Sequence, residues 1–393
     1  MSTADRGLPD RPAGPLSDIT VIDLTHVING PFCTAILADM GARVIKVEPP
    51  AGDDTRNNGP YVGDKSLYFA CVNRGKESIA LDLKNEEDRA VFVNMIKQAD
   101  VVVENFRPGV MDRLGFSFDA LSKLNPTIIY AASSGFGHSG PMSSAPAYDT
   151  LIQGMSGLMD ATGFADGPAT RVGTSVSDIA AGIYLYAGIV TALYDRERTG
   201  KGTQIDIAMF DATLAFLEHP FMAWAATGKA PGRIGNRHPS MTPFDTFEAK
   251  DRTFVICCGN DHLFGLLCHA LEKPALLADP RYASNVLRTT NNAVLKADLE
   301  VILKTRSADQ WIALLQAAGV PVGPLLDIAE AAALPQTKAR NMVVTAGGLK
   351  MPGNPIKMAG YPDTPIRPAA PDLDEHGASL RKEFPGLPVE ILT

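Results

Sequence analysis

The sequence lacks the short motifs that identify several common classes of enzyme. It contains no Walker loop of the form G-x-x-x-x-G-K-S/T, no H-E-x-x-H pair and no G-x-S-x-G elbow. These absences argue against a P-loop NTPase and against a common hydrolase.

Cysteine is scarce. The chain has five cysteines, Cys33, Cys71, Cys257, Cys258 and Cys268, and no C-x-x-C pair. An odd number without framework spacing is typical of a reduced compartment rather than of a disulfide-stapled secreted fold. The first fourteen residues are polar and lack the apolar core of a signal peptide. We therefore expect a cytoplasmic protein without a metal site.

Excess positive charge and long apolar runs are also missing. The 36 Lys and Arg residues face 44 Asp and Glu residues, and the net charge of −8 argues against nucleic acid or an anionic membrane as the main partner. The uncharged apolar stretch Ile179–Tyr194 has 16 residues, which is short for a membrane span. We predict a buried helix there, and no membrane association.

The composition is that of a globular enzyme. The chain has 393 residues, of which 45% are apolar and 20% are charged. Such a composition is typical of a soluble protein, and such a length favours two domains.

The first 132 residues alternate between strand and helix patterns, which predicts an α/β fold with a doubly wound parallel sheet. The predicted strands are Ile19–Leu24, Arg43–Glu48, Ser78–Leu83, Val101–Glu104 and Ile128–Ala132. The predicted helices run from Gly30-Pro31 to Met40, over Glu86–Gln98 and over Leu121–Leu124.

The rest of the chain predicts a helical part followed by a smaller α/β domain. Residues Tyr148–Phe221 have a helical pattern with one strand at Thr203–Ile207, and a loop follows at Gly228–Pro243. Strands are then expected at Phe244–Phe247 and Phe254–Cys258, with helices at His262–Leu271, Ala293–Leu303 and Ala308–Ala317. The last seventy residues are rich in Pro and Gly, so they need another surface on which to pack.

Two polar segments follow predicted strands, where open α/β sheets bind ligands. In Thr25–Pro31, N–H groups at a helix start could receive a phosphate or a carboxylate, although a simple capped turn fits the same residues. In Glu104–Gly109 and just beyond, Arg107 and Arg113 could grip phosphates, or they could be solvated arginines.

Two further segments lie later in the chain. The glycine-rich loop Ser133–Pro141 is a weak signal alone, and its N–H groups from Gly135 to Gly140 are candidate oxyanion donors. Asp149 follows Tyr148 where a helix begins, so it is either an ordinary N-cap or a reactive carboxylate.

Together these segments resemble the family III CoA-transferases, the CaiB/BaiF-type enzymes, over nearly the whole chain. The number and order of the matching pieces make the resemblance specific. They are Asp23-Leu-Thr-His, Gly30-Pro31, Val44-Ile-Lys-Val-Glu-Pro-Pro50, Gly52-Asp-Asp-Thr-Arg56, Asn73-Arg74-Gly-Lys76, Leu81-Asp-Leu-Lys84, Ala99–Gly109, Ser134-Gly-Phe-Gly137, Tyr148-Asp149, Arg171-Val-Gly173, Asp178-Ile-Ala-Ala-Gly182 and Arg196–Gly202.

The resemblance implies an interlocked homodimer in which each chain is threaded through the other. It implies a Rossmann-like large domain over residues 1–220, a small α/β domain over residues 221–324, and a segment of residues 325–393 that returns to the large domain. It also implies that acyl-CoA and a carboxylic acid are the substrates, with no tightly bound cofactor.

The resemblance further implies roles for individual residues. Asp149 matches the family's catalytic aspartate, which would attack a thioester and form a mixed anhydride and then an aspartyl-CoA thioester. We also expect the helix-start residues after the first strand to contact CoA. The expected CoA-binding residues are Val27, Ile28, Asn29, Leu81, Lys84, Asn105, Phe106, Arg107 and Arg113.

Departures from the family pattern concern the acid substrate. The formyl-CoA:oxalate members carry Gln where this chain has Ile28, which argues against oxalate. The loop Gly235–Ser240 is more similar to that of members acting on succinyl-CoA and a dicarboxylate. Arg237 or His238 could then pair with a distal carboxylate of the substrate. Alternatively, the loop serves only to fold against the partner chain. Gly137 and His138 are further candidates for the substrate site.

Two alternatives remain. An α-methylacyl-CoA racemase shares the fold but typically reads Gly-His-Asp where this chain reads Ala147-Tyr148-Asp149, so a natural proton carrier is missing here. A non-catalytic CoA-binding protein is the other alternative, and the retained aspartate argues against it.

Overall fold

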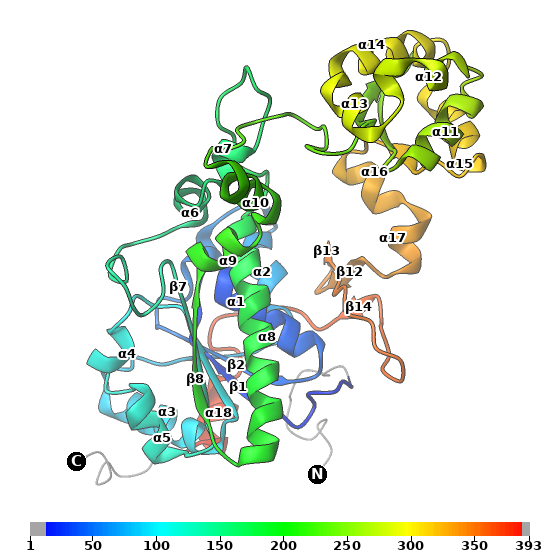
Figure 1. The fold of residues 1–393 in the computed structure, drawn as a ribbon. Helices are drawn as coiled ribbons and strands as arrows, with labels where there is room; N and C mark the ends of the chain where they lie inside the picture. The colour runs from blue at the N-terminus through cyan, green and yellow to red at the C-terminus, as the bar shows by residue number, and fades with distance from the viewer. Residues whose placement is uncertain (1–12, 387–393) are drawn as a thin grey trace. The chain divides into compact units, whose positions relative to one another are not determined.

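The computed structural model describes residues 13–386 and divides the chain into two compact units (Figure 1). Within these residues, unit 1 comprises residues 13–158, 171–228 and 334–386, and unit 2 comprises residues 159–170 and 229–333. The domain limits expected from the sequence stay a prediction.

Unit 1 is built on a six-stranded parallel sheet, which confirms the predicted α/β class. The strand order is β5-β2-β1-β6-β7-β8, and every neighbouring pair is parallel. In chain order this is 3-2-1-4-5-6, the order of the Rossmann fold. The strands are β1 (Thr20–Asp23), β2 (Arg43–Glu48), β5 (Glu77–Ala80), β6 (Val101–Glu104), β7 (Ile129–Ser134) and β8 (Thr203–Ala208).

Successive residues of these strands enter different cores, as the alternation of a strand requires. Val21 packs with α1 (Asn29–Asp39) and α8 (Val176–Thr199) on one face of the sheet. Its neighbour Ile22 packs with α3 (Glu86–Gln98) and α5 (Phe118–Leu124) on the other face. Because both faces are covered, the strands are continuous apolar runs, and the sequence signal for them was strong.

Local signals define the ends of the main helices. The Asn85 side chain accepts hydrogen bonds from the N–H groups of Glu87 and Asp88 and so caps α3. The helix α8 ends at Gly200, which has the left-handed φ of 68°.

By length and composition alone α8 could cross a membrane, but Leu185 and Ile189 are buried against the sheet. This burial agrees with the expected core helix.

Shorter elements complete the N-terminal parts of unit 1. They are the 3₁₀ helix η2 (Asp54–Asn57), the hairpin β3 (Tyr61–Val62) and β4 (Lys65–Ser66), α2 (Leu67–Asn73), α4 (Val110–Arg113), α6 (Asp149–Met155), α7 (Leu158–Ala161, whose later residues belong to unit 2), α9 (Met209–Ala215) and α10 (Glu218–Thr227).

The C-terminal segment returns to this sheet. It forms α17 (Pro335–Ala339), a small sheet of β12 (Val343–Ala346), β13 (Leu349–Pro352) and β14 (Ile366–Arg367), and finally α18 (Gly377–Glu383). Leu380 of α18 is buried in the core that contains Ile22, and the Arg43 guanidinium donates hydrogen bonds to Glu77 and Glu383. The segment thus covers one edge of unit 1, next to β5.

Unit 2 is a three-stranded antiparallel sheet with helices packed on it. The strand order is β11-β10-β9, with β9 at Phe244–Glu248, β10 at Thr253–Cys257 and β11 at Val322–Pro324. The helices are α11 (Asp261–Ala270), α12 (Ala275–Ala278), α13 (Asn285–Thr290), α14 (Asn292–Leu303), α15 (Ala308–Ala317) and α16 (Ile328–Ala333). A 3₁₀ helix, η3, spans Pro280–Tyr282.

A buried ion network lies at the carboxyl ends of β1 and β2 in unit 1. The Lys76 ammonium donates to Asp23 Oδ2, Thr34 Oγ1 and Asn73 Oδ1, each at 2.8 Å. Burial opposes the ionisation of Asp23, but the charges of Lys76 and Lys46 outweigh it and lower its pKa to about 2. The pair is therefore ionised at neutral pH inside the protein.

We expect Lys76→Met to destabilise the protein by about 3–5 kcal/mol, because the Asp23 carboxylate would remain buried with its main counter-charge gone. Urea unfolding followed by circular dichroism measures this change. As a control, Lys65→Met removes the exposed pair with Asp372 and should cost less than about 1 kcal/mol. Equal losses in both variants would contradict the assigned importance of the buried pair.

Candidate active site

A cavity of about 200 Å³, here called cavity A, lies where the strand order of the sheet reverses. From β1 the chain proceeds to β2 and β5 on one side, and from β6 it proceeds to β7 and β8 on the other. Such a switch point opens a crevice at the carboxyl ends of the strands. Cavity A is lined by His26, Val27, Asn29, Asn105–Pro108, Ser133–Gly135, Ser143, Ala145–Tyr148, Asp178 and Met209.

A second cavity of about 290 Å³, cavity B, adjoins it. The two cavities share His26 and Phe106, whose rings are stacked with centroids 5.7 Å apart. Cavity B extends over the ends of β2 and β5, where Leu81 and Lys84 line it. A long ligand could therefore occupy both cavities.

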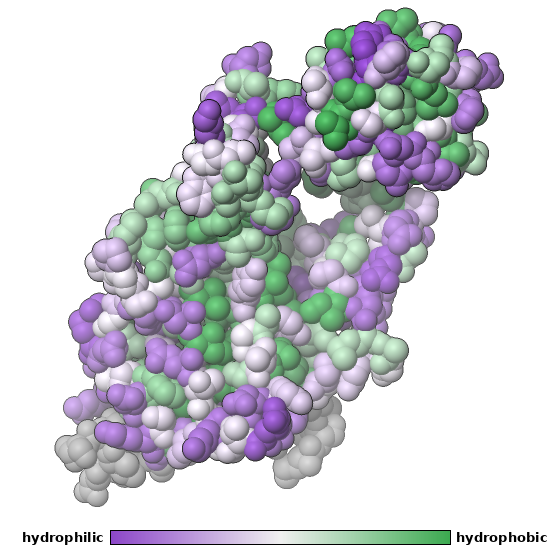
Figure 2. Space-filling view, viewed as in Figure 1, coloured by the Kyte–Doolittle hydropathy of each residue, from purple (hydrophilic) through white to green (hydrophobic). Residues whose placement is uncertain are grey.

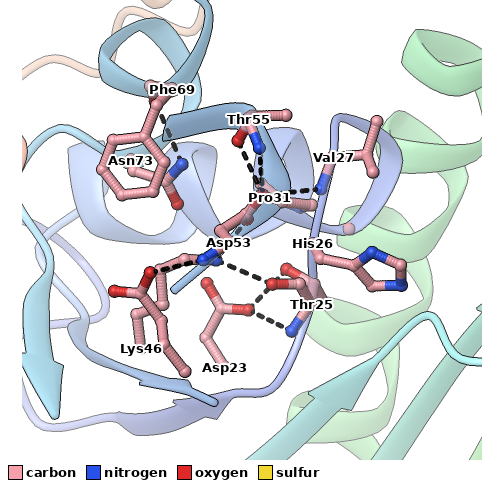
Figure 3. Close-up of polar contacts among 12 residues, drawn as sticks. Asp23, Thr25, His26, Val27, Pro31, Lys46, Asp53, Thr55, Phe69 and Asn73 are labelled. Carbon is pink, nitrogen blue, oxygen red and sulfur yellow. Dashed lines mark hydrogen bonds and ion pairs between the residues drawn. The ribbon is translucent and has the colours of Figure 1, made fainter. Parts of the chain in front are cut away.

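The loop after β1 is held by the buried ion network (Figure 3). Asp23 Oδ1 accepts a hydrogen bond from Thr25 N at 2.9 Å, and Lys46 Nζ donates to Thr25 O at 2.7 Å. Lys46 also pairs with Asp53 at 3.0 Å. Val27 then adopts a φ of 66°, a strained conformation for a β-branched residue. The strain is retained because the surrounding contacts fix the loop.

The loop after β6 is tied to the loop after β1. Asn105 Oδ1 accepts from His26 N at 2.9 Å, and Asn105 Nδ2 donates to His26 O at 2.8 Å. Burial lowers the pKa of His26, so its ring is neutral at neutral pH. This reciprocal clamp fixes the position of Phe106 between the two cavities.

Two neighbouring carboxylates, Asp149 and Asp178, lie at the starts of α6 and α8. Asp149 is buried in the first turn of α6, where Oδ1 accepts from Ser177 N at 2.9 Å and Oδ2 accepts from Gln153 Nε2 at 2.7 Å. Asp178 follows Ser177 in the first turn of α8 and lines the cavity. Asp149 therefore anchors the start of the helix that presents Asp178.

The environment makes Asp178 unusually basic for an aspartate. Burial and the nearby negative charge of Asp149 raise its pKa to about 7. A carboxylate with a raised pKa is a stronger nucleophile when ionised. The pKa of the Tyr68 phenol is raised by burial and by the charges of Asp178 and Asp149, so this neutral hydroxyl also lies near the pair.

A third buried carboxyl lies beneath the loop after β6. Glu104 Oε2 accepts from Phe106 N at 2.6 Å, and Glu104 Oε1 accepts from the Tyr130 hydroxyl at 2.9 Å. Burial raises the pKa of Glu104 to about 7. His138 Nε2 lies 3.8 Å from Glu104 Oε1. The carboxyl thus links the position of Phe106 to the glycine-rich loop.

The structure brings together most of the residues that the sequence predicts to bind CoA. Val27, Asn29, Asn105, Phe106 and Arg107 line cavity A, while Leu81, Lys84 and Phe106 line cavity B. Their assignment to CoA stays a prediction.

Other predicted residues lie outside these linings. Ile28 precedes α1 and Arg113 ends α4, and neither is among the residues that line either cavity. Gly137 and His138 belong to the loop above Glu104, and His138 N donates to Asp206 Oδ2. Arg237 and His238 belong to unit 2. Their roles likewise stay predictions.

The glycine-rich loop contains the spacing G-x-G-x-x-G at Gly135–Gly140. In a dinucleotide-binding site this motif opens a helix directly after a strand. Here the loop follows β7, and the next helix begins only at Asp149. The spacing therefore does not mark a dinucleotide site.

Sequence reasoning missed Asp178 as a site residue. Asp178 entered the sequence analysis only within the family segment Asp178–Gly182, and an aspartate in the first turn of a helix is often an ordinary first-turn acid. The available signal was a carboxylate at the start of a helix that follows a Gly- and Ser-containing loop, Gly173–Ser177. Only the fold places it in the same cavity as the loops after β1 and β6.

These features define a ligand-binding enzyme of the doubly wound α/β class, with a basic carboxylate at the switch point. The sequence model described as CoA-transferase family III matches residues 16–377. The chain belongs to this family and is a CoA-transferase.

Known relatives are similar over nearly their full length. The chain is 63% identical to the acetyl-CoA:oxalate CoA-transferase of Acetobacter aceti, covering 96% of this chain and 97% of the relative. It is 38% identical to the succinyl-CoA:mesaconate CoA-transferase of Haloarcula hispanica, covering 94% and 96%. A crystal structure of a CAIB/BAIF family protein from Brucella suis superposes with a TM-score of 0.84 at 40% identity, covering 95% of this chain and 100% of that one.

We expect the kcat/KM of CoA transfer to rise with pH and to level off above about pH 7, because Asp178 is ionised only above its raised pKa. Burial causes most of that shift, and the charge of Asp149 adds to it. Asp149→Asn should therefore move the acidic limb of the profile to lower pH. Rates measured from about pH 5 to pH 9 at constant ionic strength show the shift.

The matched control is Asp195→Asn, which removes an exposed carboxylate at the other end of α8. Its acidic limb should coincide with that of the unaltered chain. An acidic limb that stays in place in Asp149→Asn would contradict the coupling of the two carboxylates.

Proposed function

We propose that this chain transfers coenzyme A from an acyl-CoA to a free carboxylic acid, with Asp178 as the nucleophile. The observation that carries this assignment is position. Among the described residues that line cavity A, Asp178 is the one carboxylate. It lies with the two loops that the sequence predicts to contact CoA.

Asp149, the nucleophile expected from the sequence, has a different environment. Each of its oxygens accepts a hydrogen bond within the protein, and its side chain is not among those lining cavity A. A carboxylate oxygen attacks a thioester more readily when it faces the substrate cavity and is not already held by a hydrogen bond. The geometry therefore supports a positioning role for Asp149, and the experiment below distinguishes the two carboxylates.

The proposed chemistry proceeds through two covalent intermediates. A carboxylate oxygen attacks the thioester carbonyl, and the CoA thiolate leaves, giving a mixed anhydride. The thiolate then attacks the aspartyl carbonyl, which releases the donor acid and leaves an aspartyl-CoA thioester. The acceptor carboxylate reverses these steps and leaves with CoA. Water must be excluded while either intermediate exists.

The two cavities suit the two parts of CoA. The proposed position of the thioester is cavity A, beside Asp178, and the rest of the molecule passes the stacked His26 and Phe106 into cavity B. Lys84 at the exposed side of cavity B supplies a positive charge for phosphate. We propose that CoA is a substrate and that no cofactor is tightly bound.

The substrates belong to the proposal. The relative at 63% identity is named for acetyl-CoA and oxalate, which weighs against the argument from Ile28 that oxalate is excluded. Other relatives are named for succinyl-CoA with mesaconate or glutarate. We propose a short dicarboxylate as acceptor, with oxalate as the first candidate, and acetyl-CoA or succinyl-CoA as donor.

We expect incubation with acetyl-CoA or succinyl-CoA, without acceptor, to leave CoA bound to Asp178 as a thioester. Hydroxylamine should release the CoA and leave a hydroxamate on the same peptide. Trypsin separates the candidates, because Asp149 lies in the fragment 124–171 and Asp178 lies in the fragment 172–196. Mass spectrometry of the two fragments therefore identifies the nucleophile.

Asp178→Asn should form no adduct, and Asp149→Asn should still form one on the fragment 172–196. A hydroxamate on the fragment 124–171 would return the role to Asp149. Exchange of the substrate α-proton with deuterated water, without any adduct, would favour the racemase alternative.

We also propose a cytoplasmic homodimer of interlocked chains. The helix α10 has no buried residue, and it exposes Phe221, Met222 and Trp224, each by about half. Hydrophobic residues are visible on this side of unit 1 in Figure 2. An apolar helix without a covering surface is typical of a protein–protein interface.

We expect light scattering to give a mass near twice the chain mass of 41.8 kDa. Met222→Lys combined with Trp224→Lys should abolish the dimer, because charges would be buried at the interface. Val301→Lys, which alters an exposed apolar residue of unit 2, is the control and should leave the mass unchanged. A monomer mass for the unaltered chain would contradict the proposal.

A further inference from the structure

We propose that Asn29 and Ser133 form a subsite in cavity A that binds a carboxylate of the dicarboxylic acceptor beside Asp178. This inference rests on the proposed function, since an acceptor acid is bound only if the chain transfers CoA to one. It assigns the two side chains a role in the choice of the acid rather than in binding CoA.

Both side chains carry polar atoms that nothing in the described part of the chain satisfies. Asn29 is 4% exposed and its Oδ1 has no hydrogen-bond partner, and Ser133 is fully buried with its Oγ unpartnered. Buried polar groups are almost always hydrogen-bonded, and exceptions call for a ligand or water. Because both residues line cavity A, a carboxylate in that cavity can accept a hydrogen bond from the Ser133 hydroxyl. Asn29 Oδ1 is itself an acceptor, so the group of Asn29 that would bind a carboxylate is its Nδ2 amide.

The position of Asn29 favours an anion. Asn29 is the first residue of α1, a helix of 11 residues. The first N–H groups of a helix have no partner within it and carry a partial positive charge. The Asn29 amide and the Ser133 hydroxyl can both donate hydrogen bonds to a carboxylate oxygen. The combination suits a carboxylate better than an apolar acyl chain.

Close packing places Asn29 and Ser133 near Asp178, the proposed nucleophile. Gly182 lies one turn after Asp178 on the same face of α8, and a Cβ atom at Gly182 would lie 2.7 Å from the Asn29 carbonyl oxygen. The start of α8 therefore lies directly on the start of α1. On the other side, a Cβ atom at Gly135 would lie 2.2 Å from Ala147 Cβ. This contact holds the end of β7, with Ser133, against the segment before Asp149.

The remaining lining gives the subsite its selectivity. Arg107 from the loop after β6 lines the same cavity and offsets the charge that a second carboxylate brings near Asp178. The acetyl group of acetyl-CoA carries no free carboxylate, so it does not use the subsite. Loss of the subsite should therefore affect the acceptor half of the reaction and spare the acetyl-CoA half.

The test is a comparison of Ser133→Ala and Asn29→Ala with the unaltered chain, using acetyl-CoA as donor and oxalate, mesaconate or glutarate as acceptor. We expect the KM for the acceptor to rise about tenfold in each variant, the scale of a hydrogen bond to a charged group. In Ser133→Ala the KM for acetyl-CoA and the rate of adduct formation without acceptor should not change. Ser133→Ala keeps the test valid if Asn29→Ala folds poorly, because the hydroxyl it removes bonds to nothing in the described chain.

The matched control is Thr289→Val, which removes another buried, unpartnered hydroxyl, from unit 2. It should leave both KM values unchanged. The subsite is overturned if Ser133→Ala leaves the acceptor KM unchanged, or if both KM values rise equally. In either case the proposed function still stands as long as the unaltered chain transfers CoA. No transfer and no adduct in the unaltered chain with any of these substrates overturns the proposed function itself.

Discussion

The Lys76 ammonium, buried against the Asp23 carboxylate, is the contact on which the arrangement of unit 1 depends. It joins the end of β1 to Thr34 of α1 and to Asn73 of α2. Lys46 extends the network from β2 to the Thr25 carbonyl and to Asp53. Charges buried in this way are stable only when every member is paired. The network therefore fixes one conformation for the loop after β1, and through the clamp between His26 and Asn105 it fixes the loop after β6 as well.

A rigid frame of this kind permits an unfavourable arrangement of charge next to it. Asp149 and Asp178 are close enough for the charge of one to raise the pKa of the other. The hydrogen bonds from Ser177 N and Gln153 Nε2 keep Asp149 in place. Asp178 then combines partial burial with like-charge repulsion, which is the usual way in which a protein makes a carboxyl group more basic. The repulsion persists because the helix starts that carry the two residues cannot move apart.

The sequence predicted the elements whose signals are local and left out those that depend on tertiary contacts. The limits of β2, α3, β6 and α15 agree with prediction to the residue, because buried strands and capped helices have strong patterns. The small sheet of β12, β13 and β14 was not predicted, since its strands are short and lie in a segment rich in Pro and Gly.

The parallel sheet was inferred from the alternation of strands and helices, but the reversal of its strand order between β1 and β6 is a property of the whole fold. That reversal brings Asp178 into the same cavity as Asn29, although the two residues are 149 positions apart in the sequence. No local pattern contains this information.

Unpartnered polar atoms in this chain acquire meaning only from what surrounds them. Thr289 Oγ1 is such an atom in unit 2, yet it lines neither cavity A nor cavity B. Nearby, the buried Arg288 guanidinium donates to Thr242 O, Tyr282 O and Asp261 Oδ1, so polar groups in that region can be fully satisfied. At cavity A three departures coincide: the positive φ of Val27, the raised pKa of Asp178, and the unpartnered atoms of Asn29 and Ser133. Strain, perturbed ionisation and unsatisfied hydrogen bonding each lower stability, and proteins retain them together where a ligand or a reaction needs them. Their coincidence at the switch point, next to a network in which every charge is paired, separates the part of unit 1 that maintains the fold from the part that acts on substrate.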